Sequence, residues 1–259
     1  MAWFSPYTLQ PVYKYEIFGL LLALSVHNGF ILPVRFPLAL YRALLRDPTS
    51  APPAELSWIA DGWPERARYY DDCEEPYNFD FDFTIDIGRP FNKSITFDMT
   101  IARDDKWSCR DAITHALKED ELGGSGPPVT HASIEAFRQS YVQWLLDISV
   151  RDALRAFVRG FQSLLSFHEL HCLQPEALRL LVEGAEKELD VDRLQRWTTY
   201  PGPEFDPHSQ TLELFWDAAR TWDSDYKKKF LKFITGSDRM PMQGEQGIDF
   251  KIQRSGAAR

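Results

Sequence analysis

Hydrophobic residues recur along the chain at two different spacings. Between residues 79 and 101 they alternate with polar residues, which is the period of a strand with one buried face. The first run holds Phe79, Phe81, Phe83, Ile85 and Ile87, and the second holds Ile95, Phe97, Met99 and Ile101. Because residues 88–92 can turn the chain between the runs, we predict an antiparallel β-hairpin.

Elsewhere the hydrophobic residues recur every three or four positions, which is typical of helices with one buried face. Helices are predicted over residues 14–27, 37–45, 55–70, 130–148, 150–165, 175–183, 209–221 and 224–235, with shorter ones over 109–118 and after Asp190. We expect Gly184 and Gly236 to end their helices. The predicted fold class is α+β, predominantly helical, with one small hairpin unit among helices.

The composition and net charge of the chain limit the partners that it can bind. The chain has 259 residues, 44% of them hydrophobic, and a formal charge of -9, so it should fold and should not bind nucleic acid or an anionic membrane surface. The most apolar stretch, Ile17 to Val26, has ten residues. That is about half the length of a membrane span, so we expect a buried core helix there.

The three cysteines are Cys73, Cys109 and Cys172. They lie far apart and form no C-x-x-C pair, which favours reduced thiols and a cytoplasmic or nuclear location. The opening sequence, MAWFSPYTLQP, also lacks the pattern of a secretory signal.

Two clusters could carry chemistry, and each has a simpler interpretation. His168, His171 and Cys172 are possible zinc ligands, but their spacing is not that of a zinc motif and favours a helix-connecting loop with a half-buried histidine. The polar face of the hairpin would hold Asp80, Asp82, Asp86 and Asp98, either as a solvated face or as a site for a cation or a basic helix. No cofactor motif is present, and we expect neither a cofactor nor a metal.

Four stretches, in order, resemble the HECT domain of ubiquitin ligases. They are YEIFGLLLALSVHNGFILPVRFPLALYRALL (15–45), PPVTHASIEAFRQSYVQWLLDISVRDALRAFVRGFQSLL (127–165), CLQPEALRLLVEG (172–184) and KFLKFITGSDRMP (229–241). The resemblance implies a larger N-terminal lobe over 1–241, with a smaller part for the ubiquitin-conjugating enzyme over 60–142. Residues 242–259 would be the inter-lobe joint and the first strand, 248–252, of a second lobe, and we expect the last residues to fray.

The resemblance also implies a docking site for the conjugating enzyme. Phe137 and Tyr141 fall where the family places aromatic contacts, and Phe79 and Phe81 fall on its adjoining strand. Tyr70 completes the predicted set as part of the apolar material that remains in the segment 60–78. Phe137 also fits the inward stripe of its own helix, so core packing is an open alternative. The segment 60–78 departs from the family pattern because Arg66 and other charges replace an apolar helix face, which could weaken the docking groove.

In this family a cysteine of the second lobe accepts ubiquitin as a thioester before ubiquitin passes to a substrate lysine. None of the three cysteines here lies in the family's Thr-Cys-Phe motif. We therefore expect a HECT-type docking lobe that is inactive alone, with no catalytic residue of its own. Its expected partners are a conjugating enzyme and, in the full-length ligase, ubiquitin and a protein substrate. The alternative is a non-catalytic binding module or scaffold derived from a HECT domain.

Overall fold

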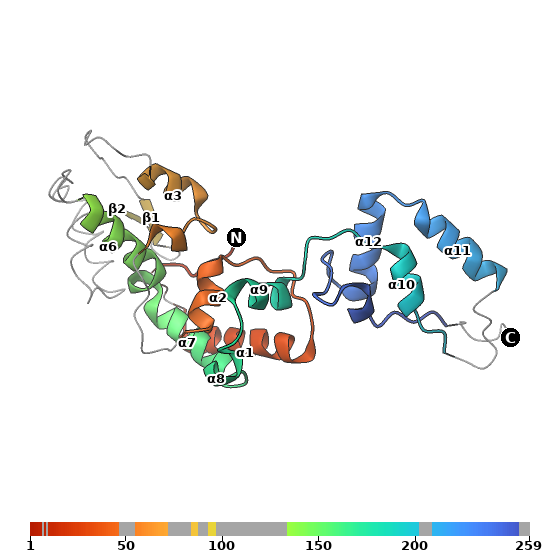
Figure 1. Ribbon diagram of the computed structural model, residues 1–259. Helices are drawn as coiled ribbons and strands as arrows, with labels where there is room; N and C mark the ends of the chain where they lie inside the picture. Colours follow the sequence, from red (N-terminus) through yellow and green to blue (C-terminus); the bar gives the residue numbers. More distant parts are fainter. Residues whose placement is uncertain are drawn as a thin grey trace. The chain divides into compact units, whose positions relative to one another are not determined.

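The computed structural model describes residues 1–6, 8, 10–46, 55–71, 84–87, 93–96, 134–201 and 209–253 (Figure 1). The chain divides into two compact units. Unit 1 comprises Met1–Leu24 and Arg35–Glu176, and unit 2 comprises Ser25–Val34 and Ala177–Arg259. The described residues are predominantly helical, as the sequence predicted.

Unit 1 contains most of the helices that the hydrophobic spacing predicted. Its elements are α1 (Val12–Asn28, whose last turn belongs to unit 2), α2 (Leu38–Leu44), η1 (Leu56–Trp58), α3 (Pro64–Asp71), α6 (Ile134–Leu146), η2 (Ile148–Val150), α7 (Arg151–Gln162) and α8 (Phe167–Leu170). The core of unit 1 is aromatic and aliphatic, and its largest fully buried side chains are Trp144, Tyr41, Tyr141 and Phe161.

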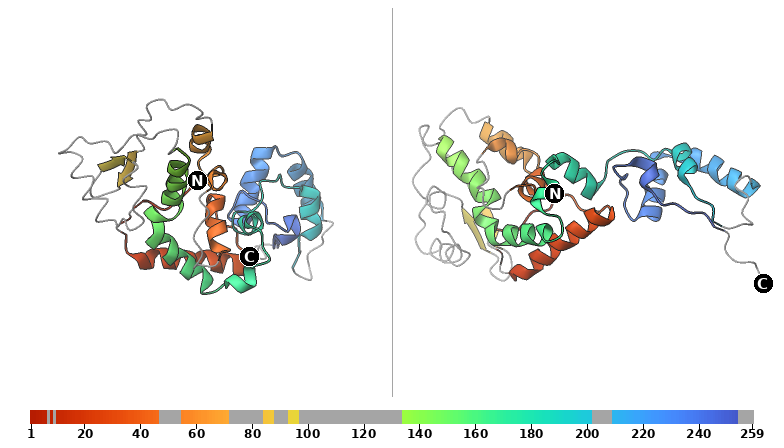
Figure 2. Two further views of the ribbon diagram at one scale, coloured as in Figure 1. Left: turned by 60° about the vertical axis from the view of Figure 1, so that its left-hand side comes forward. Right: turned by 60° about the horizontal axis from the view of Figure 1, so that its bottom comes forward.

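Two glycines let α1 and α7 cross at backbone contact (Figures 1 and 2). A Cβ atom added to Gly19 would lie 1.9 Å from the carbonyl oxygen of Phe157, and one added to Gly160 would lie 1.9 Å from that of Glu16. No side chain fits at such distances, so glycine is required on both helices. An ion pair of 3.1 Å between Arg159 and Glu16 lies beside the crossing.

The single helix predicted over 55–70 is wrong. The structure has η1, then a break at Asp61, Gly62 and Trp63, and then α3, which begins at Pro64. Proline is favoured at the first position of a helix and disfavoured inside one, because it has no backbone N–H and its ring clashes with the preceding turn. The break has a use in the fold, since the Asp61 carboxylate accepts a 2.9 Å hydrogen bond from the free backbone N–H of Leu38 at the start of α2.

The structure contains a short antiparallel strand pair within the predicted hairpin. Strand β1 (Thr84–Ile87) pairs with β2 (Lys93–Thr96), with Ile85 opposite Ile95. The outer parts of the predicted strands, 79–83 and 97–101, lie outside the described residues, as do the short helix predicted over 109–118 and the predicted N-cap at Thr130.

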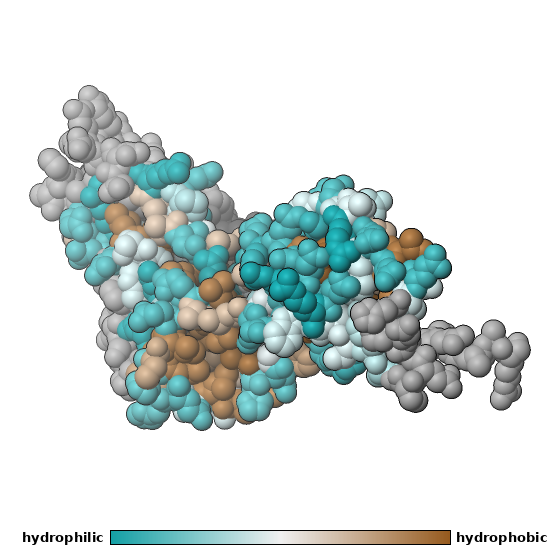
Figure 3. Space-filling model, turned by 45° about the vertical axis from the view of Figure 1, so that its right-hand side comes forward, coloured by the Kyte–Doolittle hydropathy of each residue, from teal (hydrophilic) through white to brown (hydrophobic). Residues whose placement is uncertain are grey.

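The interpretation of α1 as a buried core helix is wrong for one of its faces. Gly19, Leu22 and Ala23 are buried, but the opposite face is exposed, with 63% of Phe18 accessible. The other exposed apolar residues of α1 in unit 1 are Val12, Tyr13, Ile17, Leu20, Leu21 and Leu24. Figure 3 shows apolar side chains gathered into a broad brown area on unit 1. In the part of the chain that the structure describes, no helix has the length and apolar character of a membrane span.

Unit 2 contains α9 (Pro175–Glu183, whose first two residues belong to unit 1), α10 (Val191–Trp197), α11 (Gln210–Arg220), α12 (Ser224–Thr235) and η3 (Gly244–Gly247). The predicted helix ends are confirmed. Gly184 and Gly236 have φ values of 69° and 80°, which glycine adopts without strain. Asp190 caps α10, since its carboxylate accepts a hydrogen bond of 3.0 Å from the backbone N–H of Arg193.

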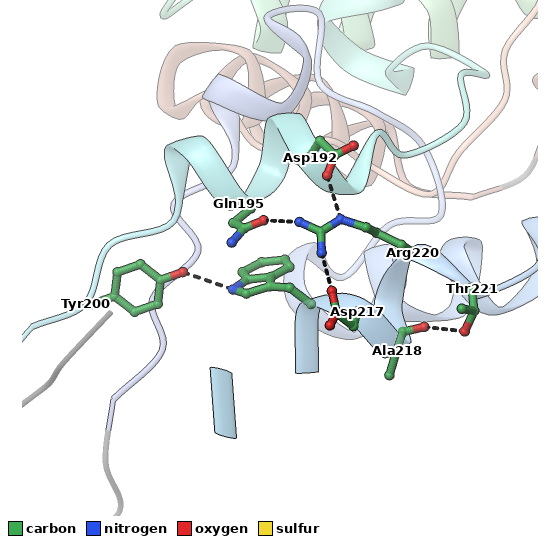
Figure 4. A network of polar contacts seen from close by, with 8 residues as sticks. Asp192, Gln195, Tyr200, Asp217, Ala218, Arg220 and Thr221 are labelled. Carbon is green, nitrogen blue, oxygen red and sulfur yellow. Dashed lines mark hydrogen bonds and ion pairs between the residues drawn. The ribbon is translucent and has the colours of Figure 1, made fainter. Parts of the chain in front are cut away.

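Arg220 joins α11 to α10 (Figure 4). Its guanidinium donates hydrogen bonds of 2.8 Å to Asp192 and 2.7 Å to Gln195 on α10, and of 2.7 Å to Asp217 on its own helix. Three acceptors therefore use the planar fork of a single arginine, an arrangement that a lysine cannot reproduce. On the same helix, the indole N–H of the buried Trp216 donates a 3.1 Å hydrogen bond to the hydroxyl of Tyr200.

A buried carboxylate ties the end of α9 to the segment after α12. Glu183 is 1% exposed and lies 3.5 Å from Arg179 and 3.8 Å from Arg239. Backbone hydrogen bonds of 2.7 and 2.9 Å connect Ala185 and Met240 in both directions. The chain that follows α12 is thus fixed to unit 2.

Residues 248–252 do not fray. The backbone of Thr199 hydrogen-bonds to Phe250 and Ile252 at 3.1 Å each, and Ile248 is buried in the unit 2 core. Phe250 also contacts the rings of Trp216 and Phe230. The expectation of a free strand failed because hydrophobic residues at alternate positions found a core within the described part of this same chain.

Candidate docking surface

The predicted docking site centres on α6, and the structure places one of its residues in the interior. Tyr141 has no exposed surface, and its hydroxyl accepts a 2.8 Å hydrogen bond from the Arg66 guanidinium on α3. Burial raises the pKa of the Tyr141 hydroxyl, while the charge and the hydrogen bond of Arg66 act in the opposite direction. The neutral tyrosine and the arginine together hold α3 against α6.

The surroundings of Tyr141 explain its burial. The Trp144 ring stacks on it, with centroids 6.1 Å apart, and Val142, Leu145 and Leu146 are buried as well. Trp3 adds a hydrogen bond from its indole N–H to the Leu145 carbonyl at 3.3 Å. The second half of α6 therefore belongs to the core of unit 1.

The first half of α6 is more open. Glu135, Ala136 and Gln139 are exposed, and Gln139 donates a hydrogen bond to Glu135 across one helical turn at 3.2 Å. Phe137 lies on the same stretch of helix. A partner can reach this part of α6, whereas the part around Tyr141 is covered.

Of the five predicted contact residues, Tyr141 is the one whose side chain the structure describes. A side chain with no exposed surface cannot touch a partner in this conformation, so Tyr141 is reassigned to the interior. Phe137 and Tyr70 lie on α6 and α3, but their side chains are outside the described part of the structure. Phe79 and Phe81 precede β1 and also fall outside it.

Arg66 was missed as a structural residue because its charge was taken as a loss of apolar surface. The structure uses that charge as a donor to a buried hydroxyl. The spacing of α3 and α6 in the sequence gives no signal for this pair, since 75 residues separate the two positions.

The interpretation of the His168 segment as a connecting loop is wrong in part, since Phe167–Leu170 forms the short helix α8. The Glu169 carboxylate accepts hydrogen bonds from the backbone N–H and the hydroxyl of Ser166, at 2.7 and 2.8 Å, and these lower the pKa of Glu169. Cys172 is exposed, with its Sγ 3.2 Å from Nε2 of His171. Within the described ranges, no three His, Cys, Asp or Glu side chains are grouped to hold a metal ion.

Comparison with known protein families identifies the fold that these elements build. The model of the HECT-domain family, described as a ubiquitin-transferase, matches residues 1–259. The chain belongs to the HECT-domain family. This confirms the resemblance drawn from the four sequence stretches and assigns the chain to a family of E3 ubiquitin ligases.

Curated relatives of this HECT chain agree with the assignment. The mouse probable E3 ubiquitin-protein ligase HECTD2 is 29% identical over 272 residues, covering 98% of this chain and 31% of that protein. The mouse probable E3 ubiquitin-protein ligase HERC4 is 28% identical over 259 residues, covering 99% of this chain and 22% of that protein. Probable E3 ubiquitin-protein ligase HUL4 of Eremothecium gossypii is 28% identical over 248 residues, covering 95% of this chain and 27% of that protein. The chain thus spans less than a third of the length of these relatives.

Proposed function

We propose that this HECT chain docks a ubiquitin-conjugating enzyme for ubiquitin transfer to substrate lysines, and that none of its three cysteines accepts ubiquitin. The observation that carries the proposal is the family match over residues 1–259. In the transfer step an acceptor thiolate attacks the carbonyl carbon of the ubiquitin thioester, a new C–S bond forms, and the thiolate of the conjugating enzyme leaves. The role of this chain is to position that enzyme.

The docking surface comprises the first half of α6 and the adjoining hairpin, within residues 60–142. Glu135, Ala136 and Gln139 are exposed on this part of α6, and we assign the aromatic anchor to Phe137 on the same stretch of helix. Buried aromatic anchors surrounded by weaker polar contacts dominate many protein interfaces. Tyr141 acts one turn further on as a positioning residue, because its hydrogen bond with Arg66 fixes α3 beside α6.

The surroundings of the cysteines support the second part of the proposal. Cys172 is the one whose side chain is described; it is exposed and follows α8 in the sequence ELHCLQ. Cys73 lies in DDCEEP and Cys109 in KWSCRD. None of these contexts is Thr-Cys-Phe, so the contact between Cys172 and His171 does not by itself make an acceptor.

A loading assay tests the cysteines. The chain is mixed with ubiquitin, activating enzyme and a panel of conjugating enzymes, and products are separated with and without reductant. We expect no reductant-sensitive ubiquitin adduct of the chain. An adduct that disappears in Cys172→Ser, or in the equivalent variant of either other cysteine, would overturn the proposal.

Binding to the same panel tests the docking surface. Titration by biolayer interferometry should find at least one saturable partner, and Phe137→Ala should weaken it about thirtyfold, the effect of losing an anchor worth about 2 kcal/mol. Leu214→Ala is the matched control, since Leu214 is an exposed apolar residue of α11 in unit 2. If Phe137→Ala lowers the melting temperature but leaves the affinity for the conjugating enzyme unchanged, Phe137 belongs to the core.

A further inference from the structure

The outer face of α12 combines exposed aromatic rings with exposed lysines. Phe233 is 85% exposed, more than any other large hydrophobic residue in the described part of the chain. Tyr226 is exposed on the same side, and the ammonium group of Lys229 lies 5.3 Å from the centre of its ring. Residues seven apart lie on one face of an α-helix, and position 229 falls between them.

This face cannot turn inward, because the opposite side of α12 is fixed. Leu231 is buried in the unit 2 core, and Phe230 and Ile234 pack against the same core. Lys227 forms an ion pair of 2.8 Å with Glu188, and Asp223 caps the helix by accepting a hydrogen bond from the backbone N–H of Tyr226. The exposure of Phe233 is therefore a property of the packed helix.

The charge of the face is opposite to that of the chain. The whole chain carries -9, yet Lys229 and Lys232 are exposed on this side of α12, and Lys228 is exposed at its edge. Among the described residues no carboxylate lies within ion-pair distance of these three lysines. Asp225 is the single acidic residue on the same side, and it lies in the first turn of α12, where the helix dipole favours a negative charge.

We propose that this α12 face, defined as Tyr226, Lys229, Lys232 and Phe233, binds an acidic peptide segment of a partner protein. The aromatic rings accept an aromatic or aliphatic side chain of the peptide, and the lysines pair with Asp or Glu on either side of it. A second copy of this chain is a poor occupant, because two lysine-rich faces repel each other.

The proposal goes beyond docking of a conjugating enzyme, since α12 is in unit 2 and the proposed docking surface is in unit 1. The probe is a fluorescein-labelled peptide with one Phe and one Leu flanked by Asp and Glu, titrated with the full chain by fluorescence anisotropy. We expect saturable binding that weakens as salt rises, because exposed ion pairs are screened. Phe233→Ala and the double variant Lys229→Glu/Lys232→Glu should each weaken it about tenfold or more.

Matched controls separate the α12 face from general effects. Leu214→Ala removes another exposed apolar side chain, and Lys187→Glu reverses another exposed lysine, so neither should change the affinity. The same peptide with Asn and Gln in place of its acids should not bind. Circular dichroism should show that Phe233→Ala folds normally, since its side chain is exposed.

Three results would overturn the proposal. The first is no saturable binding of the acidic peptide, or binding that the α12 variants leave unchanged. The second is equal affinity for a single-stranded DNA oligonucleotide, which would show a general attraction for polyanions. The third is a concentration-dependent dimer that Phe233→Ala abolishes, which would assign the face to self-association.

Discussion

Tyr141 offers the sharpest test, because removing one oxygen atom separates a buried structural tyrosine from a partner contact. Tyr141→Phe keeps the ring among Trp144 and its neighbours but leaves the Arg66 guanidinium without this acceptor. A hydrogen bond to a charged group contributes about 1.5–3 kcal/mol. Arg66 is partly exposed, and water can replace some of what is lost. We therefore expect Tyr141→Phe to lower the free energy of unfolding by about 1–2 kcal/mol.

Truncating the Tyr141 side chain to alanine should lower the free energy of unfolding further. Tyr141→Ala removes a fully buried ring, and large-to-small changes of buried aromatics cost about 3–5 kcal/mol. The effect on affinity for a conjugating enzyme should follow the loss of folded protein. The difference in affinity should disappear when binding is measured below the melting temperature of the variant and corrected for the folded fraction.

The pKa of Tyr141 adds a signature in pH. Burial raises the pKa of its hydroxyl in the folded state, so the unfolded state loses its proton first as the pH rises past about 10. The contribution of the neutral hydroxyl to stability is present below that pH and decreases as the pH rises further. Tyr141→Phe should remove this part of the alkaline decrease.

The assay is urea unfolding followed by fluorescence, at neutral pH and at several values above 10. Tyr13→Phe is the control, because Tyr13 is exposed on α1 and should change stability by less than about 0.5 kcal/mol. The reasoning is refuted if Tyr141→Phe matches wild type in stability but loses affinity for a conjugating enzyme. That result would place the hydroxyl at an interface.

Three further predictions test the packing of the two units. Gly19→Ala and Gly160→Ala should each lower the free energy of unfolding by about 2 kcal/mol or more, despite the better helix propensity of alanine. The double variant should lose less than the sum of the two, because the first clash already separates the helices. Thermal melts of all three variants check this. Glu183→Ala should destabilise by about 2–4 kcal/mol in urea unfolding, since it leaves two arginines without their shared buried carboxylate. Tyr200→Phe should cost about 1–3 kcal/mol by the same measurement, because the buried N–H of Trp216 loses its acceptor.

The helices could be predicted from the sequence because their boundaries are set locally. Proline at the start and glycine at the end act through backbone geometry alone, so the ends at Gly184 and Gly236 were correct without knowledge of the fold. The break in 55–70 could also have been found locally, since Gly62 and Pro64 lie in the middle of the predicted helix. A glycine and a proline two residues apart indicate a helix break more strongly than the weak hydrophobic pattern indicates one continuous helix.

The exposed face of α1 could not be predicted in this way. A helix that is apolar on all sides carries no amphipathic signal, and burial was the natural expectation. Which side is covered depends on the close crossing at Gly19 and Gly160, and a sequence does not show that two glycines far apart meet. The same limit applies to residues 248–252, whose acceptance into the unit 2 core depends on Thr199 and Trp216.

Arg66 shows why the charge of a segment is a poor guide to the quality of a docking groove. The sequence predicted that charge in 60–78 would weaken the site, on the assumption that each charged residue replaces an apolar contact. The guanidinium instead satisfies a buried hydroxyl on a neighbouring helix, so part of the charge in this segment supports the fold. The apolar contacts that the proposed docking surface needs must then come from residues other than Arg66. The effect of Phe137→Ala on binding, compared with that of Tyr141→Phe on stability, therefore separates the surface from its support.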